Sequence, residues 1–234
     1  HKPEGYITEQ LIFANIFEEA DEIALQTNLN ISRAFPKKVL PEINRIIKEH
    51  DSENFSSDYE DLTDRNFFTI DGKNAKDFDD AICCEKAADG YKLIVAIADV
   101  STYVSEGSSL DEVAAERATS IYLNSKVIPM LPKELSNDIC SLRTLEKRLT
   151  LFCEMFLEKD CSLSAFKFYS AIIESKKRFT YDELLNLEKD EINRYPDFSK
   201  DLRRLLEISN KRIEKRKQRL AIDFEMNEYR PEIK

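Results

Sequence analysis

The sequence has few of the residues on which histidine and cysteine chemistry depend. Its 234 residues include two histidines, His1 and His50, and neither lies in a recognisable motif. The five cysteines are odd in number and form no C-x-x-C pair, a pattern typical of reduced, mostly buried thiols. Histidine catalysis, histidine-rich metal sites and a disulfide-stapled secreted fold are therefore disfavoured, and we expect a cytoplasmic protein.

Long apolar runs and excess positive charge are also missing. No segment approaches the roughly 20 apolar residues that span a bilayer, and no signal-peptide pattern opens the chain, so no membrane association is expected. The net charge of −10 argues against nucleic-acid binding through the general surface field, because neutralisation of phosphates by Lys and Arg dominates such binding. Local contacts, or basic surface on other domains, remain compatible with a nucleic-acid enzyme. The 42% hydrophobic content suffices for a core.

The hydrophobic periodicity predicts an α+β fold with a mixed, mostly antiparallel sheet and flanking helices. Helical spacing occurs at 15–28, 39–47, 110–119, 181–187 and 202–219. Strand-like runs occur at 67–71, 81–85, 91–99, 121–123, 127–128, 149–157 and 165–175. Asp89-Gly90 separates two of these runs and predicts a hairpin turn. Pro129 and Pro132 predict an irregular, rigid loop.

The most informative stretch, residues 71–80, places four carboxylates within ten positions: Asp71, Asp77, Asp79 and Asp80. They lie between two strand-like apolar runs, where like charges repel and burial is costly. A hard cation such as Mg²⁺ would relieve both problems and would pair with a substrate phosphate. Because Gly72 also marks an ordinary turn, a solvated acidic loop stays open as the alternative. An EF-hand is excluded, since Lys76 and Ile82 occupy the positions that need glycine and glutamate.

These residues begin a series of blocks that resembles the ribonuclease II/ribonuclease R exoribonuclease family, with bacterial ribonuclease R the most similar type. The blocks follow the family's order and spacing between about residues 67 and 224. They are T-I-D-G-K-N-A-K-D-F-D-D-A (69–81), V-A-I-A-D-V-S (95–101), S-I-Y-L (120–123), V-I-P-M-L-P (127–132), E-L-S (134–136), C-S-L (140–142) and R-F-T-Y-D-E (178–183).

The resemblance implies a processive hydrolase that degrades RNA from its single-stranded 3′ end to nucleoside 5′-monophosphates with Mg²⁺, for which Mn²⁺ can substitute. The family's catalytic aspartates correspond to Asp71, Asp77, Asp79 and Asp80. Of these, Asp71 and Asp80 are the expected direct metal ligands, while the other two hold the metals or the attacking water. Tyr122 corresponds to the tyrosine that contacts the terminal nucleotides. Without the resemblance, an ordinary half-buried strand aromatic would be the simpler interpretation of Tyr122.

The resemblance also implies a domain organisation. Residues 1–64 would be a connector from an upstream OB-fold domain, and residues 65–234 the N-terminal half of the catalytic domain. The remaining half would supply further phosphate-binding and stacking groups. We therefore expect the 234-residue chain alone to bind RNA weakly and to show little exonuclease activity. The whole protein is expected to be a monomer, with an RNA helicase or another RNA-decay protein as a candidate partner.

Two alternatives accompany this interpretation. A catalytically incomplete fragment that acts as an RNA- or protein-binding module would have the same sequence features. The basic stretch 203–219 could follow RNA, although a solvated helix face is the preferred interpretation. Leu220 departs from the family, which usually has glycine at that position.

Overall fold

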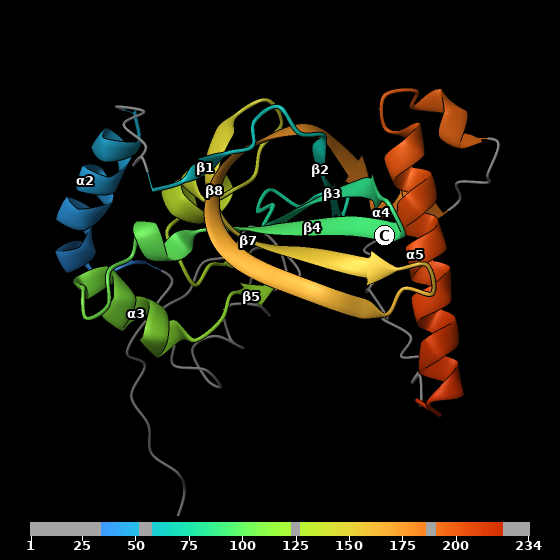
Figure 1. The fold of residues 1–234 in the computed structure, drawn as a ribbon. Helices are drawn as coiled ribbons and strands as arrows, with labels where there is room; N and C mark the ends of the chain where they lie inside the picture. Colours follow the sequence, from blue (N-terminus) through green and yellow to red (C-terminus); the bar gives the residue numbers. More distant parts are fainter. Residues whose placement is uncertain (1–33, 52–57, 123–126, 186–190, 222–234) are drawn as a thin grey trace, which may run out of the picture. The chain divides into compact units, whose positions relative to one another are not determined.

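The structure is a computed structural model that describes residues 34–51, 58–122, 127–185 and 191–221 (Figure 1). The chain divides into two compact units. One comprises His1–Ser57, Lys76–Asp79 and Ala98–Ser141, and the other comprises Asp58–Ala75, Asp80–Ile97 and Leu142–Lys234. In the described ranges, no helix combines the length and apolar character needed to cross a membrane. The helix predicted at 15–28 lies outside the described residues.

The second unit holds a six-stranded sheet that closes on itself. Its strands are β1 (Glu60–Asp61), β2 (Phe67–Asp71), β3 (Asp80–Ala87), β4 (Gly90–Ala98), β7 (Lys147–Glu158) and β8 (Leu163–Thr180). Their order is β1-β8-β2-β3-β4-β7, and β8 also pairs with β7. The long, bent β8 makes closure possible, because its first part lies beside β7 and its last part beside β2 (Figure 1).

The pairing directions confirm the predicted mixed, mostly antiparallel sheet. Antiparallel pairing joins β2 to β3, β3 to β4 and β7 to β8. Parallel pairing joins β8 to β1 and to β2. The predicted hairpin is also confirmed, with its turn one residue earlier than expected: Ala87 pairs with Gly90 across the turn residues Ala88 and Asp89, and Gly90 already begins β4. Gly90 has a second role there: a Cβ at this position would overlap the backbone of Leu157 and Glu158, so its absence lets β4 approach β7.

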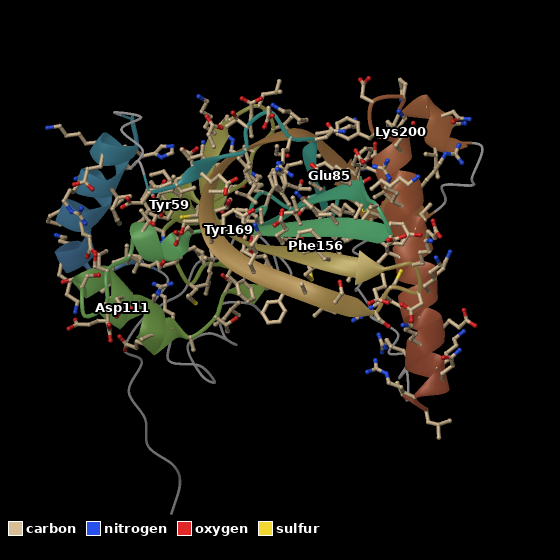
Figure 2. All side chains as sticks on the ribbon, in the orientation of Figure 1. Tyr59, Glu85, Asp111, Phe156, Tyr169 and Lys200 are labelled. Carbon is tan, nitrogen blue, oxygen red and sulfur yellow. The ribbon has the colours of Figure 1, made fainter. Side chains whose placement is uncertain are left out.

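A buried carboxylate links three strands of this sheet. Glu154 on β7 is 3% exposed and forms ion pairs with Lys92 on β4 at 2.7 Å and with Lys167 on β8 at 3.0 Å. Burial alone would raise the pKa of Glu154, but hydrogen bonds from the two lysines hold it below its usual range. Glu85 on β3, which is labelled in Figure 2, extends this network to the next strand through its ion pair with Lys92 at 3.4 Å.

Helix α5 (Ser199–Gln218) lies beside this sheet (Figure 1) and closes its core. Two shorter elements precede it, α4 (Tyr181–Leu185) and η5 (Glu191–Arg194). Leu202 of α5 packs in a buried cluster with Phe68, Phe179 and Phe198. Ile208, two turns further along, packs with residues of β3, β7 and the loop after β7. The predicted helix at 202–219 is therefore confirmed, beginning three residues earlier than expected.

The first unit is mainly helical. Its elements are η2 (Lys37–Val39), α2 (Leu40–Asp51), η3 (Val100–Thr102), α3 (Ser109–Arg117), the paired short strands β5 (Ile121–Tyr122) and β6 (Val127–Ile128), and the π-helical turn η4 (Leu135–Ile139). Two side chains cap the start of α3. Ser108 accepts a hydrogen bond from the amide of Asp111 at 3.2 Å, and Glu42 on α2 accepts one from the amide of Leu110 at 3.0 Å.

A buried arginine fixes the proline-bounded loop. Arg117, the last residue of α3, donates to the carbonyls of Pro129 at 2.9 Å and Ala34 at 3.1 Å. Its guanidinium carbon also lies 3.9 Å from the ring centroid of Phe35. The segment from Pro129 to Pro132 forms neither helix nor strand, as its two prolines predict. Within this unit, the segment following β6 is thus tied to α3.

Candidate active site

The four predicted site aspartates divide evenly between the two units. Asp71 and Asp80 belong to the sheet unit, whereas Asp77 and Asp79 belong to the helical unit. The ends of two strands position Asp71 and Asp80. Hydrogen bonds to a loop position Asp77 and Asp79.

Asp71 and Asp80 lie at the same end of two neighbouring strands. Asp71 is the last residue of β2 and Asp80 is the first residue of β3. Because these neighbouring strands run antiparallel, in the register that pairs Phe68 with Ile82, the end of one lies beside the start of the other. Asp71 is 8% exposed, while Asp80 is exposed. One carboxylate at this end of the strands is therefore largely withdrawn from water and the other faces it.

Arg178 on β8 braces the chain immediately after Asp71. One guanidinium nitrogen donates to the carbonyl of Gly72 and, at 3.0 Å, to the carbonyl of Lys73. The amide of Ala75 bonds to the same Gly72 carbonyl at 3.0 Å. An arginine donor shared by two successive carbonyls restrains the direction in which the chain leaves β2. The position of the Asp71 backbone is thus fixed by β8 as well as by its own strand.

Ser141 performs the corresponding role for the loop that carries Asp77 and Asp79. Its hydroxyl donates to the carbonyl of Lys76 at 2.9 Å and accepts from the amide of Phe78 at 3.0 Å. Ser141 is fully buried and lies two residues after the end of the π-helical turn η4, an element often found at functional sites. The hydroxyl thereby holds the backbone on both sides of Asp77, in a segment without regular secondary structure.

Tyr122 lies against these same two aspartates. Its hydroxyl donates to Asp77 Oδ2 at 3.3 Å, while 68% of the residue remains exposed. Partial burial of the hydroxyl, followed by the negative charges of Asp77 and Asp79, raises the pKa of Tyr122. An exposed ring is not the half-buried strand aromatic of the alternative interpretation. The stacking of this ring on a nucleobase stays a prediction.

The donor set suits a hard cation. Carboxylate oxygens are the ligands that Mg²⁺ prefers, and binding a cation offsets the cost of holding a charge such as that of Asp71 out of water. Within either unit, the described residues contain no group of three or more His, Cys, Asp or Glu side chains placed to share a metal ion. The metal assignment therefore stays a prediction.

Two residues with structural roles at the site were not identified from the sequence. Ser141 and Arg178 both fall inside blocks that resemble the family, C-S-L at 140–142 and R-F-T at 178–180. Their position in those blocks was the only indication in the sequence that they matter. It did not reveal what the two side chains do, because each acts on a backbone segment far away in the sequence.

Comparison with known proteins gives a family match and several relatives. A family model described as the RNB domain matches residues 59–234. Ribonuclease R of Buchnera aphidicola subsp. Acyrthosiphon pisum (strain APS) is 42% identical over 215 residues, which cover 88% of this chain and 29% of that protein.

Two solved structures are similar in fold. The apo form of Mycoplasma genitalium RNase R matches with a TM-score of 0.71 and 32% identity, over 86% of this chain and 31% of that one. The same enzyme in complex with ribose-methylated single-stranded RNA matches with a TM-score of 0.72 and 31% identity, over 88% and 32%. The chain thus spans less than a third of the length of these relatives.

Proposed function

Because this chain belongs to the RNB-domain family, we propose that it contributes the aspartate loop of an exoribonuclease that degrades RNA from the 3′ end. The products would be nucleoside 5′-monophosphates. The observation that carries the proposal is the braced loop 71–80, where an exposed tyrosine is hydrogen-bonded to one of four aspartates. The relative solved with single-stranded RNA supports the same substrate class.

The residues have distinct roles in this proposal. Asp71 and Asp80 would hold Mg²⁺ or Mn²⁺, and Asp77 and Asp79 would hold the metals or orient the attacking water. A cation bound there would supply polarisation of the scissile phosphate and activation of that water. Tyr122 offers its exposed face to a base near the 3′ end, which suits an enzyme that must accept every base.

Ser141 and Arg178 would contribute indirectly. Each restrains the backbone next to an aspartate through hydrogen bonds to carbonyl or amide groups. Restrained carboxylates need little reorganisation when charge develops on the phosphate. We further propose that the whole protein acts in the cytoplasm as a monomer, with an RNA helicase or another RNA-decay protein as a candidate partner.

The proposal is tested by metal removal from the complete protein encoded by the gene. With a 5′-labelled single-stranded oligoribonucleotide and Mg²⁺, we expect a ladder of products that shorten from the 3′ end. Chelation with EDTA should stop the reaction, and added Mg²⁺ or Mn²⁺ should restore it, because the carboxylates alone cannot neutralise the phosphate. Cleavage that EDTA leaves unchanged would contradict the metal assignment. RNA binding without shortening would instead support a binding module.

In the complete protein, Tyr122→Ala is expected to lengthen the final RNA product more than it slows the degradation of long RNA. Removing one stacking partner costs about 1–3 kcal/mol, and this loss matters most when few nucleotides remain bound. Tyr122→Phe is the matched control, because it keeps the ring and removes only the hydrogen bond to Asp77. Product lengths are read on a sequencing gel. An unchanged shortest product with Tyr122→Ala would show that the ring does not stack on the RNA end.

A further inference from the structure

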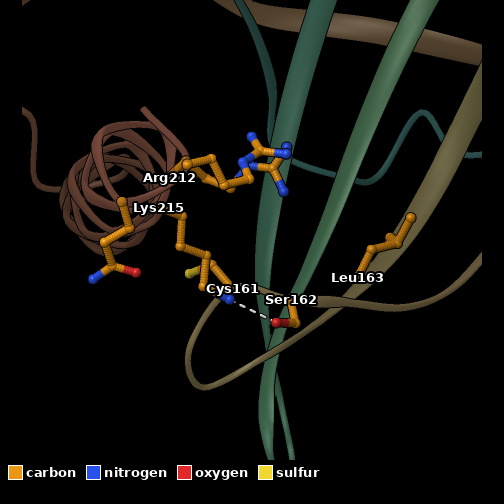
Figure 3. A pocket seen from close by; sticks show the side chains of 7 residues that line it. Cys161, Ser162, Leu163, Arg212 and Lys215 are labelled. Atoms are coloured by element: carbon orange, nitrogen blue, oxygen red, sulfur yellow. Dashed lines mark hydrogen bonds between the residues drawn. The ribbon is translucent and has the colours of Figure 1, made fainter. Parts of the chain in front are cut away.

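A pocket of about 440 Å³ lies between the last turns of α5 and the loop that joins β7 to β8 (Figure 3). The helix supplies Arg212, Lys215 and Gln218, its C-cap is Arg219, and the loop supplies Cys161 and Ser162. All of these elements belong to the sheet unit. None of the aspartates of the candidate active site lines this pocket.

The pocket concentrates positive charge in a chain whose net charge is −10. Arg212, Lys215 and Arg219 recur at helical spacing, which places their side chains on one face of α5. Like charges so close together repel one another, although the negative end of the helix dipole partly offsets this cost. A bound anion would remove the remaining repulsion.

Hydrogen bonds hold the loop side of the pocket against the helix. The Lys215 ammonium contacts Asp160 Oδ2 at 2.7 Å and Ser162 Oγ at 2.6 Å, the latter drawn as a dashed line in Figure 3. Asp160 also accepts from the Ser162 amide at 2.9 Å, and the hydrogen bond from Lys215 lowers the pKa of Asp160. Between them, Cys161 has a left-handed backbone with φ of 62° and is fully buried. The loop therefore holds one conformation against the helix.

The two arginines of the pocket stand apart from the others. Among the arginines that the structure describes, all but Arg212 and Arg219 have an interaction partner: Arg45, Arg65, Arg117, Arg143, Arg148, Arg178, Arg194, Arg203, Arg204 and Arg216. Both exceptions line the same cavity. A guanidinium presents several donors in a planar fork that matches the oxygens of a phosphate.

We propose that this pocket binds a phosphate group. Arg212 and Arg219 would donate to its oxygens, and Ser162 and Lys215 would fix the side facing the loop. The phosphate could belong to the backbone of a single-stranded polynucleotide or to a free ion or mononucleotide, because the recognising chemistry is the same. The site requires neither the aspartates nor a metal ion, so its binding can be measured independently of RNA hydrolysis.

The test uses the 234-residue chain and two double variants. Arg212→Gln/Arg219→Gln removes the two unpartnered guanidiniums. Lys200→Gln/Lys217→Gln is the matched control, since it removes the same charge from exposed positions of the same helix outside the pocket (Lys200 is labelled in Figure 2). Inorganic phosphate and uridine 5′-monophosphate are titrated by ¹⁵N NMR, following the Ser162 amide and the arginine Nε signals. A fluorescent oligouridylate is titrated by anisotropy at several salt concentrations.

We expect phosphate to shift the Ser162 and arginine signals of the unmodified chain, and the pocket variant to bind about tenfold more weakly. The control should change affinity by less than about twofold. If the oligouridylate loses affinity and its salt dependence falls by about one to two ions, the source is a polynucleotide backbone. If only phosphate and the mononucleotide lose affinity, the source is a free phosphate.

The proposal is overturned by either of two results. One is the absence of Ser162 and arginine signal changes in the unmodified chain at saturating phosphate. The other is an equal loss of affinity in the pocket variant and the control, which would show a general charge effect. Equal thermal unfolding midpoints for the three proteins confirm that the substitutions leave the fold intact. Since no readout depends on cleavage, failure here is distinct from failure of the proposed exoribonuclease activity.

Discussion

Asp79→Asn in the complete protein is expected to lower nucleotide release from RNA by at least about 10²–10³-fold while RNA binding survives. Asparagine keeps the size of the side chain and removes the negative charge that the proposed chemistry needs. The substitution should leave the loop in place, because the backbone of Asp79 is held within its own unit: its carbonyl accepts from the amide of Ala98 at 2.9 Å. Asp79 is also exposed, so the change should cost little stability.

Asp89→Asn provides the control for this experiment. Asp89 lies in the turn between β3 and β4, its side chain is 93% exposed, and its one charge contact is to Lys159 at 3.6 Å. Asparagine and aspartate are both residues that suit turns, so this variant makes an identical chemical change at an exposed position away from the loop. Initial rates on a labelled oligoribonucleotide and filter binding at the same Mg²⁺ concentration distinguish the two. Turnover by Asp79→Asn within about twofold of the control would remove Asp79 from the mechanism.

The strands near the site could be predicted because their signals are local. The strand at 67–71 and the hairpin around Asp89-Gly90 follow from apolar runs and turn residues that lie next to one another. β8 was predicted over 165–175 but extends from Leu163 to Thr180. Its last part pairs with β2 instead of β7, and Lys176, Lys177 and Arg178 interrupt the apolar pattern there. Pairing with β2, which is distant in the sequence, therefore sets the end of β8, and hydrophobic periodicity carries no signal of it.

The site shows the same division. Four carboxylates in ten residues are visible in the sequence, and their chemistry follows from their type. Their support is not visible, because Ser141 acts on residues 63 and 65 positions away. Arg178 acts on residues 105 and 106 positions away. No spacing rule relates a side-chain donor to a backbone carbonyl at such separations. The assignment of the metal and of the domain boundary at residue 64 remains a prediction.

The backbone conformation of Leu220 explains why a glycine would suit this position. Leu220 has φ of 57° and is 88% exposed. It follows Arg219, the C-cap of α5. The amide of Leu220 donates to the carbonyl of Lys217, and the amide of Ala221 donates to the carbonyl of Arg216. This is the helix ending in which glycine is favoured, because the left-handed backbone strains other residues. A glycine, which the family resemblance implies at this position, would adopt this backbone without strain, whereas leucine adopts it at an energetic cost.

Phe179→Ala is expected to lower the free energy of unfolding of the 234-residue chain by about 3–5 kcal/mol, a large part of the 5–15 kcal/mol typical of a domain. Phe179 is fully buried. Its ring packs edge-on against those of Phe68 at 5.3 Å, Phe198 at 5.6 Å and Tyr195 at 5.0 Å between centroids. Alanine would leave a cavity bordered by three rings and would remove three aromatic contacts. Urea denaturation followed by circular dichroism measures the loss.

Phe166→Ala makes the same change on the same strand at a residue that is 59% exposed, so it should cost less than about 1 kcal/mol. A similar loss in both variants would show that the aromatic cluster is not the centre of the core. The buried ring also affects the site: Phe179 pairs with Ile70 and Thr180 with Asp71 in the β2–β8 register, and Arg178 precedes it. Hydrogen exchange should therefore speed up at the amides of residues 70–73 in Phe179→Ala under native conditions, while Phe166→Ala should leave them protected.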